Sequence, residues 1–195
     1  MEAVRAANRR MNLTSITEED AFVRDHILDS LAGLALLPPA GSVIDVGSGA
    51  GFPGVVIAIA RPELRVTLLE ASQKKAAFLA SSGLPVVRAR AEEYGRGPGR
   101  DAYDVAVARA VAPLAVVAEL VLPLLRPGGA AVLWVGREVA GEAGEAARVC
   151  AALGATPERV VASASPGRRF RILRKIGPTP ARFPRRAGVA ARRPL

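Results

Sequence analysis

Cysteine, histidine and tryptophan are nearly absent from this chain of 195 residues, which has one of each. The single cysteine, Cys150, cannot form a disulfide within the chain, and the lack of a Cys/His cluster excludes a structural zinc site. No apolar run has the roughly 18 uninterrupted residues that a membrane span needs. No basic start leads into an apolar secretory segment. We therefore expect a soluble, cytoplasmic protein that holds no metal.

Acidic residues are also absent, but only from one end of the chain. Residues 168–195 hold ten Arg or Lys and no Asp or Glu, whereas residues 1–167 hold 17 basic and 18 acidic residues. Clustered arginines favour binding to the phosphates of a nucleic acid. A compositional bias is the alternative, since 24 of the 27 basic residues are Arg. Such a bias does not explain why the acids disappear only at the C-terminus.

Predicted strands and helices alternate through the middle of the chain. Short apolar, β-branched runs predict strands, and segments with helix signals lie between them. The predicted strands are residues 42–46, 66–70, 86–90, 104–108 and 130–135, and the helices between them are residues 53–60, 72–81 and 113–125. The pattern continues with a helix at 138–153 and strands at 160–163 and 170–175. This alternation predicts an α/β fold, with a mostly parallel, twisted sheet and helices on both faces.

Two smaller segments flank this predicted domain, which spans residues 42–177. Residues 1–41 are expected to form a short N-terminal helical extension, in which Thr17 caps a helix that ends before Pro38. Residues 178–195 contain four prolines and five arginines. We expect them to form a basic, irregular C-terminal tail on the surface.

A glycine-rich turn follows the first predicted strand. Its glycines let the chain turn sharply and approach a ligand closely, and the amides of the following helix face the same space. Gly49, Gly51 and Gly54 also satisfy the G-x-G-x-x-G pattern of dinucleotide-binding proteins, so NAD remains an alternative. Asp45 places a carboxylate beside the turn, which suits a cationic methionine moiety better than a pyrophosphate. It can instead accept hydrogen bonds from loop amides only.

The ends of the next strands point to the same site, because ligands of such sheets lie outside the carboxyl ends of the strands. Glu70 ends the second predicted strand, where a carboxylate can accept hydrogen bonds from both hydroxyls of a ribose. Ala91 and Glu92 follow the third strand, in a place that suits an adenine. Arg109 follows the fourth and faces the reactive end of a cofactor. These positions predict a cofactor that contains a nucleoside.

Five short motifs extend over nearly the whole chain. They are Asn12-Leu13-Thr14, His26-Ile27-Leu28-Asp29-Ser30-Leu31, Asp45-Val46-Gly47-Ser48-Gly49-Ala50-Gly51-Phe52-Pro53-Gly54, Ala108-Arg109-Ala110-Val111-Ala112-Pro113-Leu114 and Pro184-Arg185-Arg186-Ala187-Gly188. In order and spacing they resemble the RsmG (GidB) family. The resemblance implies a Rossmann-like class I methyltransferase fold. It also implies transfer of a methyl group from S-adenosylmethionine to N7 of a guanine in 16S ribosomal RNA.

Together with the strand-end argument, the resemblance implies roles for individual residues. The expected cofactor contacts are Asp45, Gly47, Gly49, Phe52, Glu70, Ala71, Ser72, Ala91, Glu92 and Arg109, the last of them between the cofactor and the RNA. The expected RNA contacts are Asn12, His26, Arg168, Arg185 and Arg186. Without the resemblance, Phe52 is an ordinary core aromatic residue and His26 is a hydrogen-bonded packing residue.

The implied chemistry needs no general base. Guanine N7 carries a free lone pair, so it can attack the sulfonium methyl group without prior loss of a proton. Catalysis then rests on holding the reacting atoms in line, with Arg109 as a positioning residue. A cysteine nucleophile is disfavoured because Cys150 lies in an Ala-rich late helix, far from the strand ends.

Three substrate-side features depart from the family pattern, one of them being Arg168-Arg169-Phe170, which only partly follows an Arg-His-Leu pattern. Val135 stands where a lysine is common, and Asp25 stands where a basic residue is common. A second hypothesis is therefore an RNA- or ribosome-binding protein with the same fold and little activity. A third is an NAD-dependent oxidoreductase, disfavoured because no Tyr/Lys or His/Asp pair lies where a proton donor is needed. We expect small-subunit ribosomal RNA or a 30S-type particle as the partner, and a monomeric chain.

Overall fold

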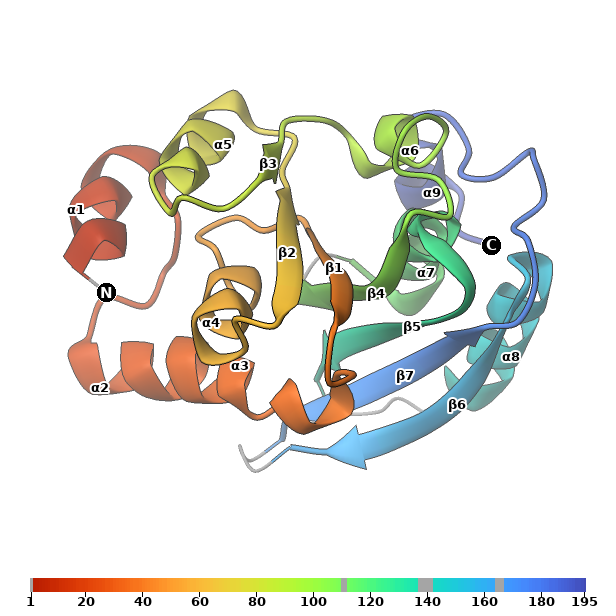
Figure 1. Ribbon diagram of the computed structural model, residues 1–195, viewed down its shortest axis with the longest axis horizontal. Coiled ribbons are helices and arrows are strands. Elements are labelled where there is room, and N and C mark those ends of the chain that lie inside the picture. The colour runs from red at the N-terminus through yellow and green to blue at the C-terminus, as the bar shows by residue number, and fades with distance from the viewer. Residues whose placement is uncertain (1, 110–111, 137–141, 164–166) are drawn as a thin grey trace.

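The computed structural model describes residues 2–109, 112–136, 142–163 and 167–195. In these ranges, one seven-stranded sheet has the strand order β3-β2-β1-β4-β5-β7-β6 (Figure 1). The strands are β1 (Gly41–Val46), β2 (Leu64–Leu69), β3 (Val86–Val87), β4 (Tyr103–Arg109), β5 (Leu125–Val135), β6 (Ala155–Ala162) and β7 (Arg169–Lys175). Strands β1 to β5 are parallel, and β7 is antiparallel to both of its neighbours. The expected mostly parallel α/β sheet is confirmed.

Helices cover both faces of the sheet. One face carries α4 (Gly54–Ala60) and α5 (Gln73–Ala80), and the other carries α7 (Leu114–Val121) and α8 (Glu142–Ala152). Successive residues of a strand point to opposite faces. On β4, Val105 and Val107 therefore pack in the core layer under α4 and α5. Ala106 and Ala108 pack in the core layer under α7 and α8. The central strands are apolar on both sides because both sides are covered.

Several element boundaries differ from the predicted ones, and β5, for example, begins at Leu125 rather than at residue 130. The predicted start of the helix at residues 138–153 lies outside the described residues. Helix α7 ends at Val121 and is followed by the 3-10 turn η3 (Leu122–Leu124), since Pro123 has no amide hydrogen to continue the α-helix. Strand β3 has only two residues and is soon followed by α6 (Ala91–Tyr94). Strand β6 begins at Ala155 rather than at residue 160, because it pairs with β7 along its whole length.

The N-terminal segment is helical, as expected. Helix α1 (Glu2–Met11) contacts α5, and a second helical stretch runs along the lower left of Figure 1. This stretch consists of α2 (Glu19–Phe22), the π-helical η1 (Val23–Leu28) and α3 (Asp29–Leu31), and the 3-10 turn η2 (Leu34–Leu36) leads into β1. The predicted cap at Thr17 is wrong. Glu18 caps the helix, because its longer side chain reaches the amides of both Asp20 and Ala21.

The C-terminal segment is irregular apart from the short helix α9 (Val189–Arg192). Most of its residues are exposed or half-buried, as expected for a surface segment, but parts of it reach the core, which was not expected. Phe183 and Ala190 are buried, and Phe183 joins the core layer under α7 and α8. The apolar side chains between the arginines therefore pack the segment onto the domain.

None of the helices in the described ranges is long and apolar enough to cross a membrane. In the same ranges, no cluster of three or more His, Cys, Asp or Glu side chains is arranged to hold a metal ion. Cys150 is buried in α8, and this burial raises the pKa of its thiol to about 11. A buried, protonated thiol is a poor nucleophile.

Candidate functional site

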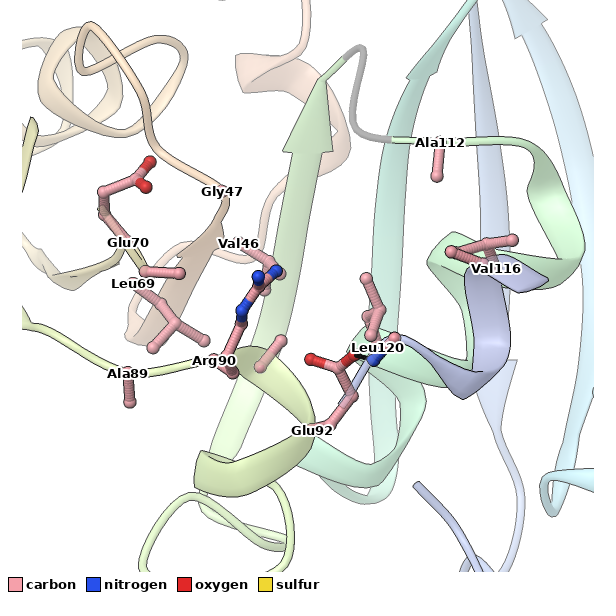
Figure 2. A pocket seen from close by; sticks show the side chains of 14 residues that line it. Val46, Gly47, Leu69, Glu70, Ala89, Arg90, Glu92, Ala112, Val116 and Leu120 are labelled. Atoms are coloured by element: carbon pink, nitrogen blue, oxygen red, sulfur yellow. Dashed lines mark hydrogen bonds between the residues drawn. The ribbon is translucent and has the colours of Figure 1, made fainter. Parts of the chain in front are cut away.

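A cavity of about 260 Å³ opens at the carboxyl ends of β1 and β2 (Figure 2). Five of the predicted cofactor residues line it, namely Gly47, Glu70, Ala71, Ala91 and Glu92. The rest of the lining comes from Val46, Leu69, Ala89, Arg90, Ala112, Val116, Leu120, Gly188 and Ala191. The cavity is thus mostly apolar, with two carboxylates and one guanidinium at its edges. This composition suits a nucleoside with polar edges.

The glycine loop makes the floor of this cavity possible. Gly47, Gly49 and Gly51 have φ values of 74°, 56° and 95°, in the left-handed region where a Cβ is unfavourable. Gly54 is required for a different reason. A Cβ there would come within 2.6 Å of Asp45 Oδ2 and of Leu68 Cδ2, because the start of α4 packs directly on β1 and β2.

Glu70 is the carboxylate that the sequence predicts for a ribose. Its Oε2 accepts a hydrogen bond from the Gly49 amide at 3.0 Å, and its Oε1 accepts one from the Ser72 amide at 2.7 Å. Ser72 in turn caps α5 through its hydroxyl oxygen. Gly49 and Ser72 are not among the residues that line the cavity. Their amides instead orient the Glu70 carboxylate, which does line it.

Asp45 lies behind the loop and is 1% exposed. Its Oδ2 accepts a hydrogen bond from the Gly54 amide at 3.0 Å. Its Oδ1 is buried and has no hydrogen-bond partner among the described residues. Burial raises the pKa of Asp45 to about 7, although the Gly54 hydrogen bond opposes this shift. A buried acceptor without a partner is suited to a cationic amine. Asp45 does not line the strand-end cavity, however, so its contact with the methionine moiety remains a prediction.

Arg109 ends β4, as predicted, and its side chain contacts residues of η1 and α3. Its Nη1 donates to the Asp25 carbonyl at 2.9 Å and to Asp29 Oδ2 at 3.2 Å, and its Nη2 lies 3.0 Å from His26 Nδ1. Its Cζ stands 5.5 Å from the centre of the Phe52 ring. Asp29 is buried, so the ion pair is shielded from water. Arg109 is therefore fixed in place from four directions.

His26 joins the same cluster from the π-helical stretch. Its ring stacks on Phe52, with ring centres 4.8 Å apart and planes 7° from parallel, and Phe22 packs edge-on against it. Burial lowers the pKa of His26, and the charge of Arg109 adds to this effect. Because a guanidinium can only donate, Nδ1 accepts from Arg109 and Nε2–H donates to Thr14 Oγ1 at 2.8 Å. His26 is thus a packing residue and, at the same time, a neighbour of the predicted reaction site.

Phe52 does not line the strand-end cavity. It lies in an apolar hollow of about 230 Å³ beneath α1, next to Val4 and Phe78. Its other neighbours are Phe22, His26 and Arg109. The contact with the cofactor therefore remains a prediction, whereas the role of Phe52 in holding Arg109 is visible.

The five predicted RNA contacts fall into different places. Asn12 is exposed after α1, with a left-handed φ of 49°. Arg168 is exposed just before β7, and its charge acts on both Asp25 and Arg109, so it lies on the His26 side of the molecule. Arg186 is exposed on the C-terminal segment, but Arg185 forms an ion pair with the buried Glu119.

Several lining residues lack a signal in the sequence pattern. Arg90 is exposed, and Figure 2 shows its side chain extending across the cavity towards Val46. Gly188 and Ala191 come from the C-terminal segment, far along the chain from the other lining residues. The terminal motif pointed at this segment but did not show where it packs.

Strand order, glycine loop and strand-end carboxylate together define a class I, S-adenosylmethionine-dependent methyltransferase. The chain belongs to the GidB family, described as rRNA small subunit methyltransferase G, whose model matches residues 1–171. A relative named ribosomal RNA small subunit methyltransferase G from Roseiflexus sp. (strain RS-1) is 45% identical over 98% of this chain and 87% of its own length. One of the same name from Symbiobacterium thermophilum is 44% identical over 100% of this chain and 87% of its own.

Solved structures agree on the fold. A Thermus thermophilus 16S rRNA N2 G1207 methyltransferase in complex with AdoMet and guanosine has a TM-score of 0.58 and 21% identity, over 78% of this chain and 40% of that one. A TehB-like methyltransferase from Corynebacterium glutamicum has a TM-score of 0.60 and 16% identity, over 89% of this chain and 98% of that one. At these identities the likeness supports the fold alone.

Proposed function

We propose that this protein transfers the methyl group of S-adenosylmethionine to N7 of a guanine in 16S ribosomal RNA. The observation that carries the proposal is the strand-end cavity with Glu70 at its edge, in a chain of the GidB family. We further infer that the chain acts in the cytoplasm as a monomer, on the RNA or on a 30S-type particle. Its division at residues 41 and 177 into extension, domain and tail is part of the same proposal.

The cofactor would lie along the strand ends with its parts in a fixed order. Glu70 would accept hydrogen bonds from the ribose hydroxyls, and Ala91 and Glu92 would border the adenine. Asp45 would face the methionine amine through its unpartnered oxygen. This order would direct the methyl group towards Arg109, since Arg109 ends the next strand of the sheet.

The protein's contribution to the reaction is orientation. The N7 lone pair would form the new N–C bond as the C–S bond of the sulfonium breaks, so the positive charge would move to the purine and no proton transfer would be needed. Holding the reacting atoms in line can contribute roughly 7 kcal/mol or more to the rate. The Arg109 cluster is suited to this role because its members are fixed by hydrogen bonds and stacking.

The RNA would approach from the side of the His26 helix. Asn12 and Arg168 are exposed there, and Arg186 offers a second exposed cation on the C-terminal segment. His26 would act through Arg109 and Phe52 rather than as a proton carrier, because burial lowers its pKa and it is neutral at pH 7. These RNA contacts are proposals that rest on exposure and charge.

A methyl-transfer assay tests the proposed function. Small subunits from a strain that lacks this methyltransferase are incubated with the protein and methyl-labelled S-adenosylmethionine, and the RNA is digested to nucleosides. Label in 7-methylguanosine is the expected result. Binding of S-adenosylhomocysteine without incorporation would favour the RNA-binding protein with little activity, and binding of NAD instead would favour the oxidoreductase.

A further inference from the structure

The C-terminal segment, which follows the last strand of the sheet, contributes residues to the cofactor cavity. Gly188 and Ala191 belong to the cavity lining, and α9 packs against α7 (Figure 1). The terminal Pro-Arg-Arg-Ala-Gly motif ends at Gly188, so it leads the chain directly to the cavity. Apart from Glu92, the proposed methyl transfer uses none of the residues that hold this segment.

Two carboxylates of the domain hold the segment in place. Glu119 of α7 is fully buried and accepts hydrogen bonds from the Arg185 amide at 2.8 Å and from Arg185 Nε and Nη2 at 2.9 and 2.5 Å. Glu92 accepts a hydrogen bond from the Gly188 amide at 2.8 Å. The first carboxylate anchors the middle of the segment, and the second anchors the residue that lines the cavity.

Further contacts fix the chain just before the motif. Arg96 Nε donates to the Pro184 carbonyl at 2.7 Å, and Arg100 Nη1 donates to the Phe183 carbonyl at 2.8 Å. The Phe183 ring is buried in the core layer of α7. The wall of the cavity is therefore attached at several successive residues.

The positive charge of Arg185 is paired with the Glu119 carboxylate in this attachment. A buried carboxylate without a partner is costly, so Glu119 needs the guanidinium. The hydrogen bonds to Glu119 raise the pKa of Arg185, which shows that the pairing favours its charged form. A guanidinium held in this way is poorly placed to bind RNA phosphate as well.

The chemistry of the wall matches an adenine. The segment touches the cavity beside Glu92, where the nucleoside base is expected, and not beside Asp45. Among the described residues, the Gly188 amide donates to Oε1 of Glu92, so Oε2 is left to accept from an exocyclic amine. Leu120 and Ala191 supply apolar contact for a ring face.

We propose that residues 183–192 form a fixed wall of the cofactor cavity at its adenine end, and that Arg185 is a positioning residue for the cofactor through its ion pair with Glu119. This inference rests on the proposed function, because it takes S-adenosylmethionine as the ligand. It assigns the terminal motif a role other than the RNA contact expected from the sequence. In this proposal the motif serves cofactor binding first, with Arg186 left for RNA.

Calorimetric titration with S-adenosylhomocysteine tests the wall without any RNA. Arg185→Ala should weaken binding about tenfold, as expected if the wall is docked in only about a tenth of the molecules. Gly188→Ala should weaken it in the same direction, because a Cβ meets only Arg192 Nη2 at 3.8 Å but the φ of 76° is unfavourable for alanine. Arg193→Ala, a neighbouring exposed arginine, is the matched control and should bind like the wild type.

Three further readouts separate positioning from simple loss of structure. Arg185→Lys should recover most of the affinity, because a lysine can still pair with Glu119. 5′-Methylthioadenosine, which has the adenosine part only, should lose affinity in Arg185→Ala by the same factor as S-adenosylhomocysteine. In the methyl-transfer assay, Arg185→Ala should raise KM for S-adenosylmethionine while kcat and KM for the RNA stay unchanged.

The outcomes distinguish this inference from the proposed function. Wild-type affinity for S-adenosylhomocysteine in both Arg185→Ala and Gly188→Ala would overturn the inference alone. A raised KM for the RNA with an unchanged KM for S-adenosylmethionine would overturn it too, in favour of an RNA-binding arm. A wild-type protein that binds no S-adenosylhomocysteine would overturn the proposed function, and the inference with it.

Discussion

The cofactor side of the site and the Arg109 side are formed by different kinds of chemical group. On the cofactor side, backbone amides and small residues such as Gly47, Ala71 and Ala91 surround an open cavity. On the side of Arg109, large side chains from separate parts of the chain interlock, with Phe52 stacked on His26 and Arg109 paired with Asp29. The first side follows from the topology of the sheet. The Arg109 side depends on the packing of η1 and α3 against the sheet. Single substitutions there should therefore lower stability and activity more strongly.

The largest expected effect is that of Arg109→Ala. The substitution leaves the buried Asp29 carboxylate without its cation, which should lower the free energy of unfolding by about 3 kcal/mol. Methyl transfer should fall as well, because the cluster loses its central member. Urea unfolding measures the stability, and Arg24→Ala, which breaks the exposed pair with Asp25, is the control that should change it little. Equal losses in both variants would contradict the buried-pair argument.

A smaller effect is expected on the cofactor side. Glu70→Gln replaces one carboxylate oxygen by an amide donor, so it cannot accept from both Gly49 and Ser72 and loses its charge towards the ribose. One charged hydrogen bond contributes roughly 2 kcal/mol, which corresponds to about 30-fold weaker binding of S-adenosylhomocysteine. Titration calorimetry gives the affinity, with the exposed Glu93→Gln as the matched control. Unchanged affinity in Glu70→Gln would place the ribose elsewhere.

The stacking in the cluster should contribute less again. Phe52→Leu keeps an apolar side chain but removes the parallel ring under His26 and the ring face near Arg109. The expected loss of stability is about 1 kcal/mol. Thermal and urea unfolding would show it. If Phe52 also touches the cofactor, as predicted, the affinity for S-adenosylhomocysteine should fall in the same variant, and a loss of stability alone would assign Phe52 to packing only.

The smallest effect concerns pH. The folded pKa of Asp45, about 7, lies above its ordinary value of 3.8, so ionising Asp45 costs stability as pH rises towards 7 and the full cost is present above 7. A ligand amine beside the carboxylate reverses this shift. Cofactor binding should therefore release a proton below about pH 7, and affinity should rise with pH up to that value. Calorimetry in buffers of different ionisation enthalpy measures the proton, and Asp45→Asn should abolish its release.

The same comparison explains which parts of the site were predictable. Glu70, Ala91 and Arg109 are strand-end residues, and an alternating strand and helix pattern is enough to bring such residues to one edge of a parallel sheet. His26 and Arg109 lie 83 residues apart, and no local pattern encodes their contact. Only the resemblance placed them on the same side of the molecule.

The C-terminal segment and the helix cap show two other limits. The arginines of residues 178–195 suggested an exposed arm, but Glu119, 66 residues from Arg185, neutralises one of them from inside the core. In the sequence, Glu119 is simply an acidic residue within the predicted helix at 113–125. Thr17 and Glu18 are both polar and adjacent, and only the reach of the longer carboxylate decides which of them caps the helix.

A crystal structure of the complex with S-adenosylhomocysteine tests the central claim most directly. We predict the ribose hydroxyls on Glu70, the adenine between Glu92 and Ala191, and the amine towards Asp45, with residues 183–192 in place. Density for the nucleoside in the apolar hollow of Phe52 and Phe78, or a displaced C-terminal segment around a bound adenine, would contradict the account.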